Sequence, residues 1–153
     1  MKKVVFAGTF DPITRGHYDM VERACALFDE VIVALGANSS KQTYFSKEER
    51  LSQLNQVFSN FSKVSVAEYS GLTVDFAKSM GANFLLRGLR NGTDFNYEQS
   101  IAQMNFQISG IDTVFLLTQP HLSHISSSVV RDLLKYGRDC SDLLPPQFTI
   151  PSK

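Results

Sequence analysis

The sequence predicts an α/β protein: a single domain over residues 1–153, built on a doubly wound parallel sheet of about five strands. Two observations predict this fold. Short apolar runs alternate along the chain with segments of helical periodicity, and the run at residues 31–35 is apolar at consecutive positions, as in a strand buried on both faces. This alternation favours parallel strands joined by right-handed crossovers. No repeat or long linker divides the chain.

The apolar runs and the helical patterns follow one another in a regular order. The strands are expected at residues 4–7, 31–35, 64–67, 84–86 and 113–117. The helices are expected at about residues 17–28, 47–58, 73–80, 94–108 and 128–136. In the first helix the apolar residues recur at spacings of three and four, which places them on one face. These residues are Met20, Val21, Ala24 and Phe28.

Capping residues support the expected ends of several helices. Ser46 precedes Glu49 by three residues, which is the pattern of a capping box at the start of the second helix. Gly81, Gly110 and Gly137 follow the third, fourth and fifth helices. Glycine is favoured just beyond a helix because it accepts a left-handed backbone there.

Composition narrows the classes of protein. Fifteen Lys and Arg residues balance fifteen Asp and Glu residues, so no general positive charge favours nucleic acid or an anionic membrane. No apolar run approaches the roughly 18 residues that a bilayer span needs, and the N-terminal apolar run is too short for a secretory signal. The two cysteines have no metal-ligand spacing. We therefore expect a cytoplasmic protein that binds neither nucleic acid nor membrane.

Residues 8–17, Gly-Thr-Phe-Asp-Pro-Ile-Thr-Arg-Gly-His, are the most informative stretch of the chain. They follow the first strand and open a helix, and residues 14–17 have the form of the T/H-x-G-H element of nucleotidylyltransferases. The first turn of a helix offers unpaired N–H groups and a positive dipole end to a phosphate. Gly8 and Gly16 allow close approach of the backbone, and His17 is placed to donate a hydrogen bond to a phosphate oxygen.

Further clusters also follow strands, and parallel sheets bind ligands at that edge. Arg87 and Arg90 lie in a predicted loop, and guanidinium groups bind phosphate oxygens in pairs. The serines at 126–128 precede the last helix, with Arg131 one turn further on. The sequence contains neither a P-loop nor the glycine motif of dinucleotide-binding folds.

The chain resembles the bacterial phosphopantetheine adenylyltransferase family from about residue 3 to residue 144. The segment 87–98 points to this family within the nucleotidylyltransferases. The resembling motifs are residues 8–17, Ser40-Lys41, Phe45 with Glu48-Glu49-Arg50, Arg87-Gly88-Leu89-Arg90 with Asp94-Phe95-x-Tyr97-Glu98, and Ile125-Ser126-Ser127-Ser128-x-Val130-Arg131.

The resemblance implies a Rossmann-like nucleotidylyltransferase fold and a defined reaction. ATP and 4′-phosphopantetheine would give dephospho-coenzyme A and pyrophosphate, the penultimate step of coenzyme A synthesis. It also implies Mg²⁺ as cofactor and a homohexamer built as a dimer of trimers. No carboxylate cluster suits a fixed metal ion, so Mg²⁺ is expected to arrive with the triphosphate.

The resemblance also implies roles for individual residues. His17 is expected to stabilise the transition state at the phosphate under attack. The residues expected to bind the acceptor are Thr9, Lys41, Thr73 and Arg87. The residues expected to bind ATP are Thr9, Phe10, His17, Gly88, Leu89, Arg90, Glu98, Leu122, Ser123, His124, Ile125, Ser126, Ser127 and Ser128.

Several of these residues keep a second interpretation. The serines at 126–128 and Thr73 are also natural helix caps. Arg87 and Arg90 are also compatible with surface ion pairs, and Lys41 with a solvated loop lysine.

Residues 122–124 are one of three departures from the pattern of the family. Residues 122–124, Leu-Ser-His, stand where relatives usually have an aromatic-Ser-aromatic run. His124 therefore either replaces an aromatic ring or faces solvent. The other functions considered are a nicotinate-mononucleotide or glycerol-phosphate nucleotidylyltransferase and a non-catalytic nucleotide-binding module.

Overall fold

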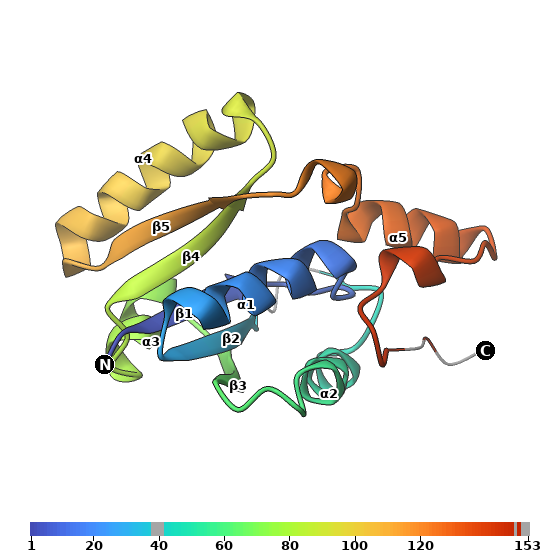
Figure 1. Ribbon diagram of the computed structural model, residues 1–153, viewed down its shortest axis with the longest axis horizontal. Coiled ribbons are helices and arrows are strands. Elements are labelled where there is room, and N and C mark those ends of the chain that lie inside the picture. Colours follow the sequence, from blue (N-terminus) through green and yellow to red (C-terminus); the bar gives the residue numbers. More distant parts are fainter. Residues whose placement is uncertain (38–41, 149, 151–153) are drawn as a thin grey trace.

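In a computed structural model that describes residues 1–37, 42–148 and 150, five strands form one parallel sheet in the order β3-β2-β1-β4-β5. From β1 the chain winds outwards through β2 and β3, and then returns to the other side of β1 for β4 and β5 (Figure 1). This order confirms the predicted doubly wound parallel sheet. The strands are β1 (Lys3–Gly8), β2 (Glu30–Gly36), β3 (Val64–Tyr69), β4 (Phe84–Leu89) and β5 (Asp112–Leu117).

The helices lie close to the positions that the sequence predicts. Ser46 caps the second helix by accepting a hydrogen bond from the backbone N–H of Glu49. Gly81 and Gly110 follow the third and fourth helices with φ angles of 73° and 75°, as expected for a left-handed backbone. The helices are α1 (Arg15–Leu27), α2 (Lys47–Val57), α3 (Thr73–Ser79), α4 (Gly92–Ser109) and α5 (Ser127–Lys135), with short 3-10 helices η1 (Pro120–Leu122) and η2 (Ser141–Leu143).

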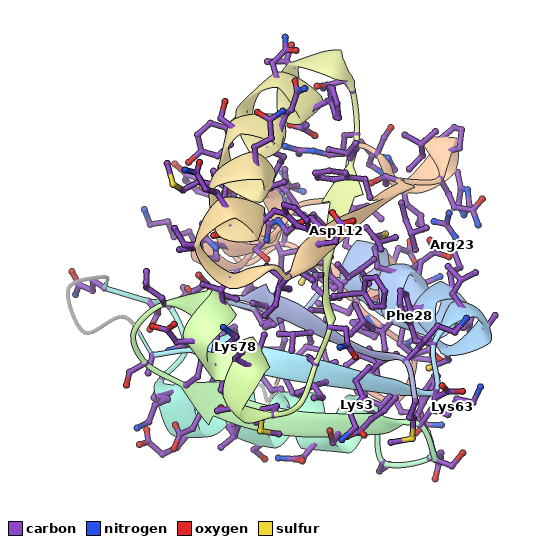
Figure 2. The ribbon with its side chains drawn as sticks, turned by 90° about the vertical axis from the view of Figure 1, so that its left-hand side faces the viewer. Lys3, Arg23, Phe28, Lys63, Lys78 and Asp112 are labelled. Atoms are coloured by element: carbon purple, nitrogen blue, oxygen red, sulfur yellow. The ribbon has the colours of Figure 1, made fainter. Side chains whose placement is uncertain are left out.

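The sheet has an apolar core on each face. Val4 and Phe6 of β1 pack with apolar residues of α1, α2 and α5, whereas Val5 packs with residues of α3 on the opposite face. Figure 2 shows this separation, with Lys78 of α3 on one side of the sheet and Arg23 of α1 on the other. Complete burial of a valine side chain contributes about 1.5–3 kcal/mol, so alternate burial on both faces fixes the orientation of this strand.

The fourth strand is longer than the sequence predicts. The prediction ended it at residue 86, because Arg and Gly are unusual in a buried strand. In the structure Arg87, Gly88 and Leu89 continue the pairing with β5. A Cβ at Gly88 would lie 3.2 Å from Cε of Met20, so the glycine admits that side chain. The interpretation that places both arginines on one loop is therefore wrong.

The sheet order creates a crevice at the carboxyl ends of β1 and β4. The chain leaves β1 towards α1 and leaves β4 towards α4, and these helices lie on opposite faces of the sheet (Figures 1 and 2). Ligands of doubly wound sheets bind at such a topological switch point. None of the described helices combines the length and apolar character that a membrane crossing requires.

Candidate active site

The loop between β1 and α1 is built around a buried aromatic ring. Phe10 has a φ of 48°, an uncommon backbone for a bulky residue. Its ring packs edge-on against Phe6 and His17, with ring centroids 5.7 and 5.1 Å away. A Cβ at Gly8 would lie 3.2 Å from Cζ of Phe10. Gly8 therefore has an internal role, because it admits this ring, besides the predicted approach of a phosphate.

His17 forms a reciprocal capping box with Thr14 at the start of α1. The backbone N–H of Thr14 donates to Nδ1 of His17 over 3.0 Å, and the hydroxyl of Thr14 accepts from the backbone N–H of His17 over 3.4 Å. Because Nδ1 accepts a hydrogen bond, the proton of the neutral ring lies on Nε2. Nε2 is therefore a hydrogen-bond donor whose direction the cap fixes.

The electrostatic surroundings keep this ring neutral. Burial and, to a smaller extent, the positive charge of Arg87 together lower the pKa of His17 to about 4. At neutral pH His17 thus offers a polarised N–H rather than a positive charge, as expected for a donor to a phosphate oxygen.

A cavity of about 620 Å³ opens beside His17, and we call it the His17 cavity. The loop after β1 forms one wall, the segment 42–44 forms a second, and the exposed side of α5 forms a third. Its lining residues are Thr9, Phe10, Asp11, His17, Gln42, Thr43, Tyr44, Ser127, Arg131, Asp132 and Lys135.

Helix α5 is tied to the motif loop through its first turn. The hydroxyl of Ser127 donates to the carbonyl of Pro12 over 2.8 Å, and Nη1 of Arg131 donates to the carbonyl of Asp11 over 2.8 Å. Ser126 is the N-cap, and its hydroxyl accepts from the backbone N–H of Val129 over 3.2 Å. The capping interpretation therefore holds for Ser126, while Ser127 connects two walls of the His17 cavity.

Sequence reasoning missed two buried charges that hold the segment 43–46 in place. The carboxylate of Asp11 accepts the backbone N–H groups of Tyr44 and Phe45 over 2.8 and 2.9 Å. Nη1 of Arg50 donates to the carbonyl of Thr9 over 2.9 Å, and its Nε donates to the carbonyl of Phe45 over 3.2 Å. These side chains are only 4% and 6% exposed. They join the motif loop to the segment that follows β2.

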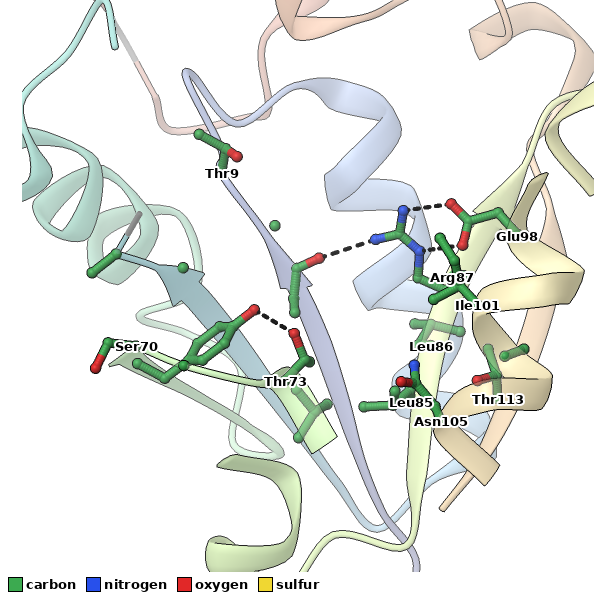
Figure 3. Close-up of a pocket in the computed structure, with 18 residues that line it drawn as sticks. Thr9, Ser70, Thr73, Leu85, Leu86, Arg87, Glu98, Ile101, Asn105 and Thr113 are labelled. Carbon is green, nitrogen blue, oxygen red and sulfur yellow. Dashed lines mark hydrogen bonds and ion pairs between the residues drawn. The ribbon is translucent and has the colours of Figure 1, made fainter. Parts of the chain in front are cut away.

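A cavity of about 560 Å³ lies on the other side of Thr9, and we call it the Arg87 cavity (Figure 3). Thr9 lines both cavities. Thr73 is at the first position of α3, after the N-cap Leu72, and its hydroxyl is 2.8 Å from that of Tyr69. The interpretation of Thr73 as a helix cap is therefore wrong. The polar and charged residues in the lining are Thr9, Tyr69, Ser70, Thr73, Arg87, Glu98, Asn105 and Thr113.

Arg87 and Glu98 form a bidentate ion pair in the wall of this cavity. Nε of Arg87 is 3.0 Å from Oε2 of Glu98, and Nη2 is 2.6 Å from Oε1. Nη1 donates to the carbonyl of Ala7 over 3.4 Å. The Arg87 side chain is 43% exposed and that of Glu98 11% exposed. The structure thus brings together two residues that the resemblance assigns to different substrates.

Arg90 lies just beyond β4 and has a carboxylate partner of its own. Its Nε and backbone N–H both donate to Oδ2 of Asp94, over 3.2 and 2.9 Å. The backbone N–H of Arg90 is the main reason that the pKa of Asp94 is lowered. Arg90 lines neither cavity, so the structure separates it from Arg87.

The remaining residues expected to bind ATP are spread over two segments. Gly88 and Leu89 lie in β4, and the side chain of Leu89 is buried. In the segment 122–128 the leucine and the isoleucine are buried, whereas Ser123 and His124 are exposed. His124 therefore faces solvent. Lys41 lies outside the described residues.

The family is decided by sequence comparison. Residues 5–133 match the family described as "Cytidylyltransferase-like". The chain is 54% identical to a phosphopantetheine adenylyltransferase of Christiangramia forsetii over 145 residues, which cover 95% of this chain and 96% of that protein. It belongs to the phosphopantetheine adenylyltransferase family. A member from Porphyromonas gingivalis is 51% identical over 152 residues, covering 98% of this chain and 99% of that one.

Solved structures support the fold that this family membership implies. The chain superposes on a bifunctional NMN adenylyltransferase/ADP ribose pyrophosphatase from Francisella tularensis with a TM-score of 0.73 and 14% identity, over 94% of this chain and 44% of that chain. It superposes on a lipopolysaccharide core biosynthesis protein from Thermoplasma volcanium with a TM-score of 0.56 and 19% identity, over 78% and 97% of the two chains. At these identities the similarity concerns the fold alone.

Proposed function

We propose that this protein transfers the adenylyl group of ATP to 4′-phosphopantetheine, giving dephospho-coenzyme A and pyrophosphate. The observation that carries the proposal is the position of Thr9, which lines both cavities. His17 in one cavity and Arg87 in the other therefore lie on either side of a common point. Relatives that are 43–54% identical over nearly the whole chain are named for this activity.

The reaction brings two anions together. An oxygen of the acceptor phosphate attacks the α-phosphorus of ATP, and the bond from this phosphorus to the bridging oxygen breaks. Pyrophosphate leaves with the electron pair of that bond. A phosphate monoester has a second pKa of about 6, so the acceptor is ionised at neutral pH and needs no strong base. Catalysis therefore depends on alignment and on donors aimed at the charge that develops.

His17 is the proposed donor to the transition state. Its Nδ1 is held by the backbone N–H of Thr14, and its ring lines the His17 cavity. Nε2–H is then available to an oxygen of the α-phosphate, which gains negative charge during the attack. A preorganised donor of this kind pays no reorganisation cost during the reaction.

We assign the two cavities to different substrates. We assign the Arg87 cavity to the acceptor, whose phosphate would meet Thr9, Arg87 and Lys41, with Thr73 beside the pantetheine arm. We assign the His17 cavity to the phosphates of ATP, which the first turn of α5 faces through Ser127. The segments 88–90 and 122–126 would meet the nucleoside part of ATP.

Mg²⁺ is proposed to arrive with the triphosphate. Among the described residues no group of three or more His, Cys, Asp or Glu side chains could hold a metal ion. Both carboxylate oxygens of Asp11 already accept backbone N–H groups. Mg²⁺ keeps several water ligands and binds readily through substrate phosphates, so these surroundings suit an ion carried by ATP. Such an ion would neutralise part of the triphosphate charge.

The exposed face of α4 supports the proposal of a homo-oligomer, a hexamer built as a dimer of trimers. Several exposed apolar side chains on one helix are typical of an interaction surface. Light scattering after gel filtration should give six times the 17.1 kDa of one chain. A cytoplasmic location is part of the same proposal, since both cysteines are free thiols. The exposed apolar residues of α4 are Phe95, Ile101, Met104, Phe106 and Ile108.

Pyrophosphate release tests the reaction directly. The assay compares ATP with 4′-phosphopantetheine, ATP with nicotinate mononucleotide, and CTP with glycerol-3-phosphate at matched concentrations. We expect the first pair to react far faster than the other two. Faster reaction with nicotinate mononucleotide or glycerol-3-phosphate would overturn the proposed acceptor.

A further inference from the structure

Tyr69, the last residue of β3, lines the Arg87 cavity. Its hydroxyl is 2.8 Å from the hydroxyl of Thr73, a contact that Figure 3 shows as a dashed line. We propose that this hydroxyl pair binds an amide group of the pantetheine arm, and that Tyr69 thereby sets the affinity for the arm of the acceptor, not for its phosphate or for ATP. This inference rests on the proposed function and adds a specificity-determining residue to it.

Tyr69 and Arg87 lie on the same face of the sheet, near its carboxyl edge. Leu85 of β4 and Ala67 of β3 both pack in the core between the sheet and α3. Side chains two residues further along each strand point to the same face, and these are Arg87 and Tyr69. Two strands, β1 and β2, separate β4 from β3. Neighbouring strands are about 4.8 Å apart, so three spacings give roughly 14 Å. An acceptor that reaches both residues must therefore be elongated.

Small residues line the cavity between these two side chains. Ala7 and Gly8 lie at the end of β1, and Gly36 and Ala37 lie at or just beyond the end of β2. A Cβ at Gly36 would be 3.5 Å from the hydroxyl oxygen of Tyr69, so this hydroxyl lies close to the backbone of the glycine. The small side chains leave room for an extended chain that runs along the edge of the sheet.

Packing holds the hydroxyl of Tyr69 in place. Its ring stacks on Phe76 of α3, with ring centroids 4.9 Å apart and an interplanar angle of 20°. Its backbone carbonyl accepts the N–H of Ala37 over 2.8 Å. Both the ring and the backbone of Tyr69 are therefore fixed before a ligand arrives. A group that is already ordered costs little further entropy when it binds a ligand.

The two hydroxyls together suit an amide group. Each hydroxyl has one O–H donor and accepts through its lone pairs. The bond between Tyr69 and Thr73 uses one donor, and within the part of the chain that the structure describes neither hydroxyl has another partner. One O–H thus remains for an amide carbonyl, and lone pairs remain for an amide N–H. The pantetheine arm carries amide groups along a flexible chain. Glycerol-3-phosphate has no amide and is too short to reach Tyr69 from Arg87.

Calorimetry on the full-length protein tests the proposal with three ligands. Tyr69→Phe keeps the ring and its stacking on Phe76 but removes the hydroxyl. We expect it to weaken the binding of 4′-phosphopantetheine and of pantetheine without the phosphate by the same factor, about 2- to 10-fold for one neutral hydrogen bond. The binding of ATP should be unchanged. Arg87→Ala should instead weaken 4′-phosphopantetheine but not pantetheine, because only the first carries the phosphate.

Steady-state kinetics gives a second readout. The arm is distant from the reacting phosphates, so its contacts are the same in the bound substrate and in the transition state. Tyr69→Phe should therefore raise the KM for 4′-phosphopantetheine and leave kcat within about twofold of wild type.

Two further variants complete the experiment. Thr73→Val removes the other hydroxyl. Because the hydroxyls act as a pair, Tyr69→Phe/Thr73→Val should lose less affinity for pantetheine than the product of the two single losses. Tyr136→Phe is the matched control, because it removes a phenolic hydroxyl from a residue that is 81% exposed and lies outside both cavities, and it should change no binding constant. Thermal unfolding of each variant checks that it is folded.

The possible results separate this inference from the proposed function. Unchanged binding of both pantetheine ligands in Tyr69→Phe would overturn the role of Tyr69, and so would a loss confined to the phosphorylated ligand. An equal loss of ATP binding would show a structural role of the hydroxyl and would also overturn the proposal. The proposed function would still stand in each case if the wild type forms pyrophosphate from ATP and 4′-phosphopantetheine. Absence of that reaction would overturn the function, whatever the binding data for Tyr69→Phe show.

Discussion

The replacement of His17 by Asn removes the proposed transition-state donor with little change elsewhere. The Oδ1 atom of Asn occupies the place of Nδ1 and still accepts the backbone N–H of Thr14. The Nε2–H group is lost. Loss of one preorganised donor costs about 2.7–4 kcal/mol in the transition state, so kcat should fall roughly 10²- to 10³-fold. The KM for ATP should change much less, because this contact strengthens mainly in the transition state.

A matched variant separates the donor from the cap. His17→Gln places an amide N–H near the position of Nε2 but leaves no acceptor at the position of Nδ1. It should therefore keep more activity than His17→Asn. The hydroxyl of Thr14 still caps the backbone N–H of residue 17, so stability should stay within about 1 kcal/mol of wild type. Steady-state pyrophosphate release measures kcat, and urea unfolding measures stability. A kcat of His17→Asn within about threefold of wild type would refute the donor role.

The pKa of His17 adds a test of its environment. This pKa is about 4 in the folded protein, compared with 6.5 for an unperturbed histidine. The unfolded chain therefore binds more protons between these values, and the free energy of unfolding falls as pH drops from 6.5 towards 4. The loss is about 3 kcal/mol at most. His17→Asn should lack this part of the pH dependence in urea unfolding at pH 7.5 and 4.5. Equal pH dependence in both proteins would contradict a buried neutral ring.

Three further predictions follow from the geometry. Arg87→Ala should chiefly weaken the binding of 4′-phosphopantetheine, and Arg90→Ala should chiefly weaken the binding of ATP, by up to about 1.5–3 kcal/mol per lost charged contact. If calorimetry shows that both variants lose equal binding free energy for both ligands, the two-cavity assignment is wrong. Asp11→Asn leaves one backbone N–H facing the NH₂ donor of the amide side chain, so the free energy of unfolding measured by urea titration should fall by about 1–3 kcal/mol. An unchanged urea midpoint of unfolding would show that the contacts of Asp11 are dispensable. Pantetheine without its phosphate should barely release pyrophosphate from ATP, because it offers no nucleophilic oxyanion and makes no charged contact with Arg87. Turnover close to that of 4′-phosphopantetheine would rule out Arg87 as a phosphate ligand.

The fold and the centre of the site were predictable because their signals are local. Mostly apolar runs of three to five residues located the strands, and glycines located the ends of three helices. The string at residues 8–17 placed His17 at the start of α1, where the structure has it. The extension of β4 through Arg87 was not predictable in this way, because only its pairing with β5 holds those polar and flexible residues in a strand.

The buried charges were missed because their partners are distant in the sequence. Asp11 bonds to backbone groups 33 and 34 residues away, and Arg50 to one 41 residues away. A partial signal existed for Arg50. It lies four residues before Leu54, so helical spacing places it on the buried face of α2. The resemblance assigned Glu98 to ATP, but no signal marked its ion pair with Arg87, which lies in a strand 11 residues earlier. The role of Lys41 stays a prediction.

Two kinds of charged contact occur at the site, and they differ in the partners of the charged side chains. Asp11 and Arg50 bond to backbone groups of loops, so their partners cannot be exchanged without unfolding those loops. Arg87 and Glu98 bond to each other in the wall of a cavity, where the Arg87 side chain is 43% exposed. Charges of the first kind fix the shape of the His17 cavity. The charge pair of the second kind lies in the wall of the Arg87 cavity.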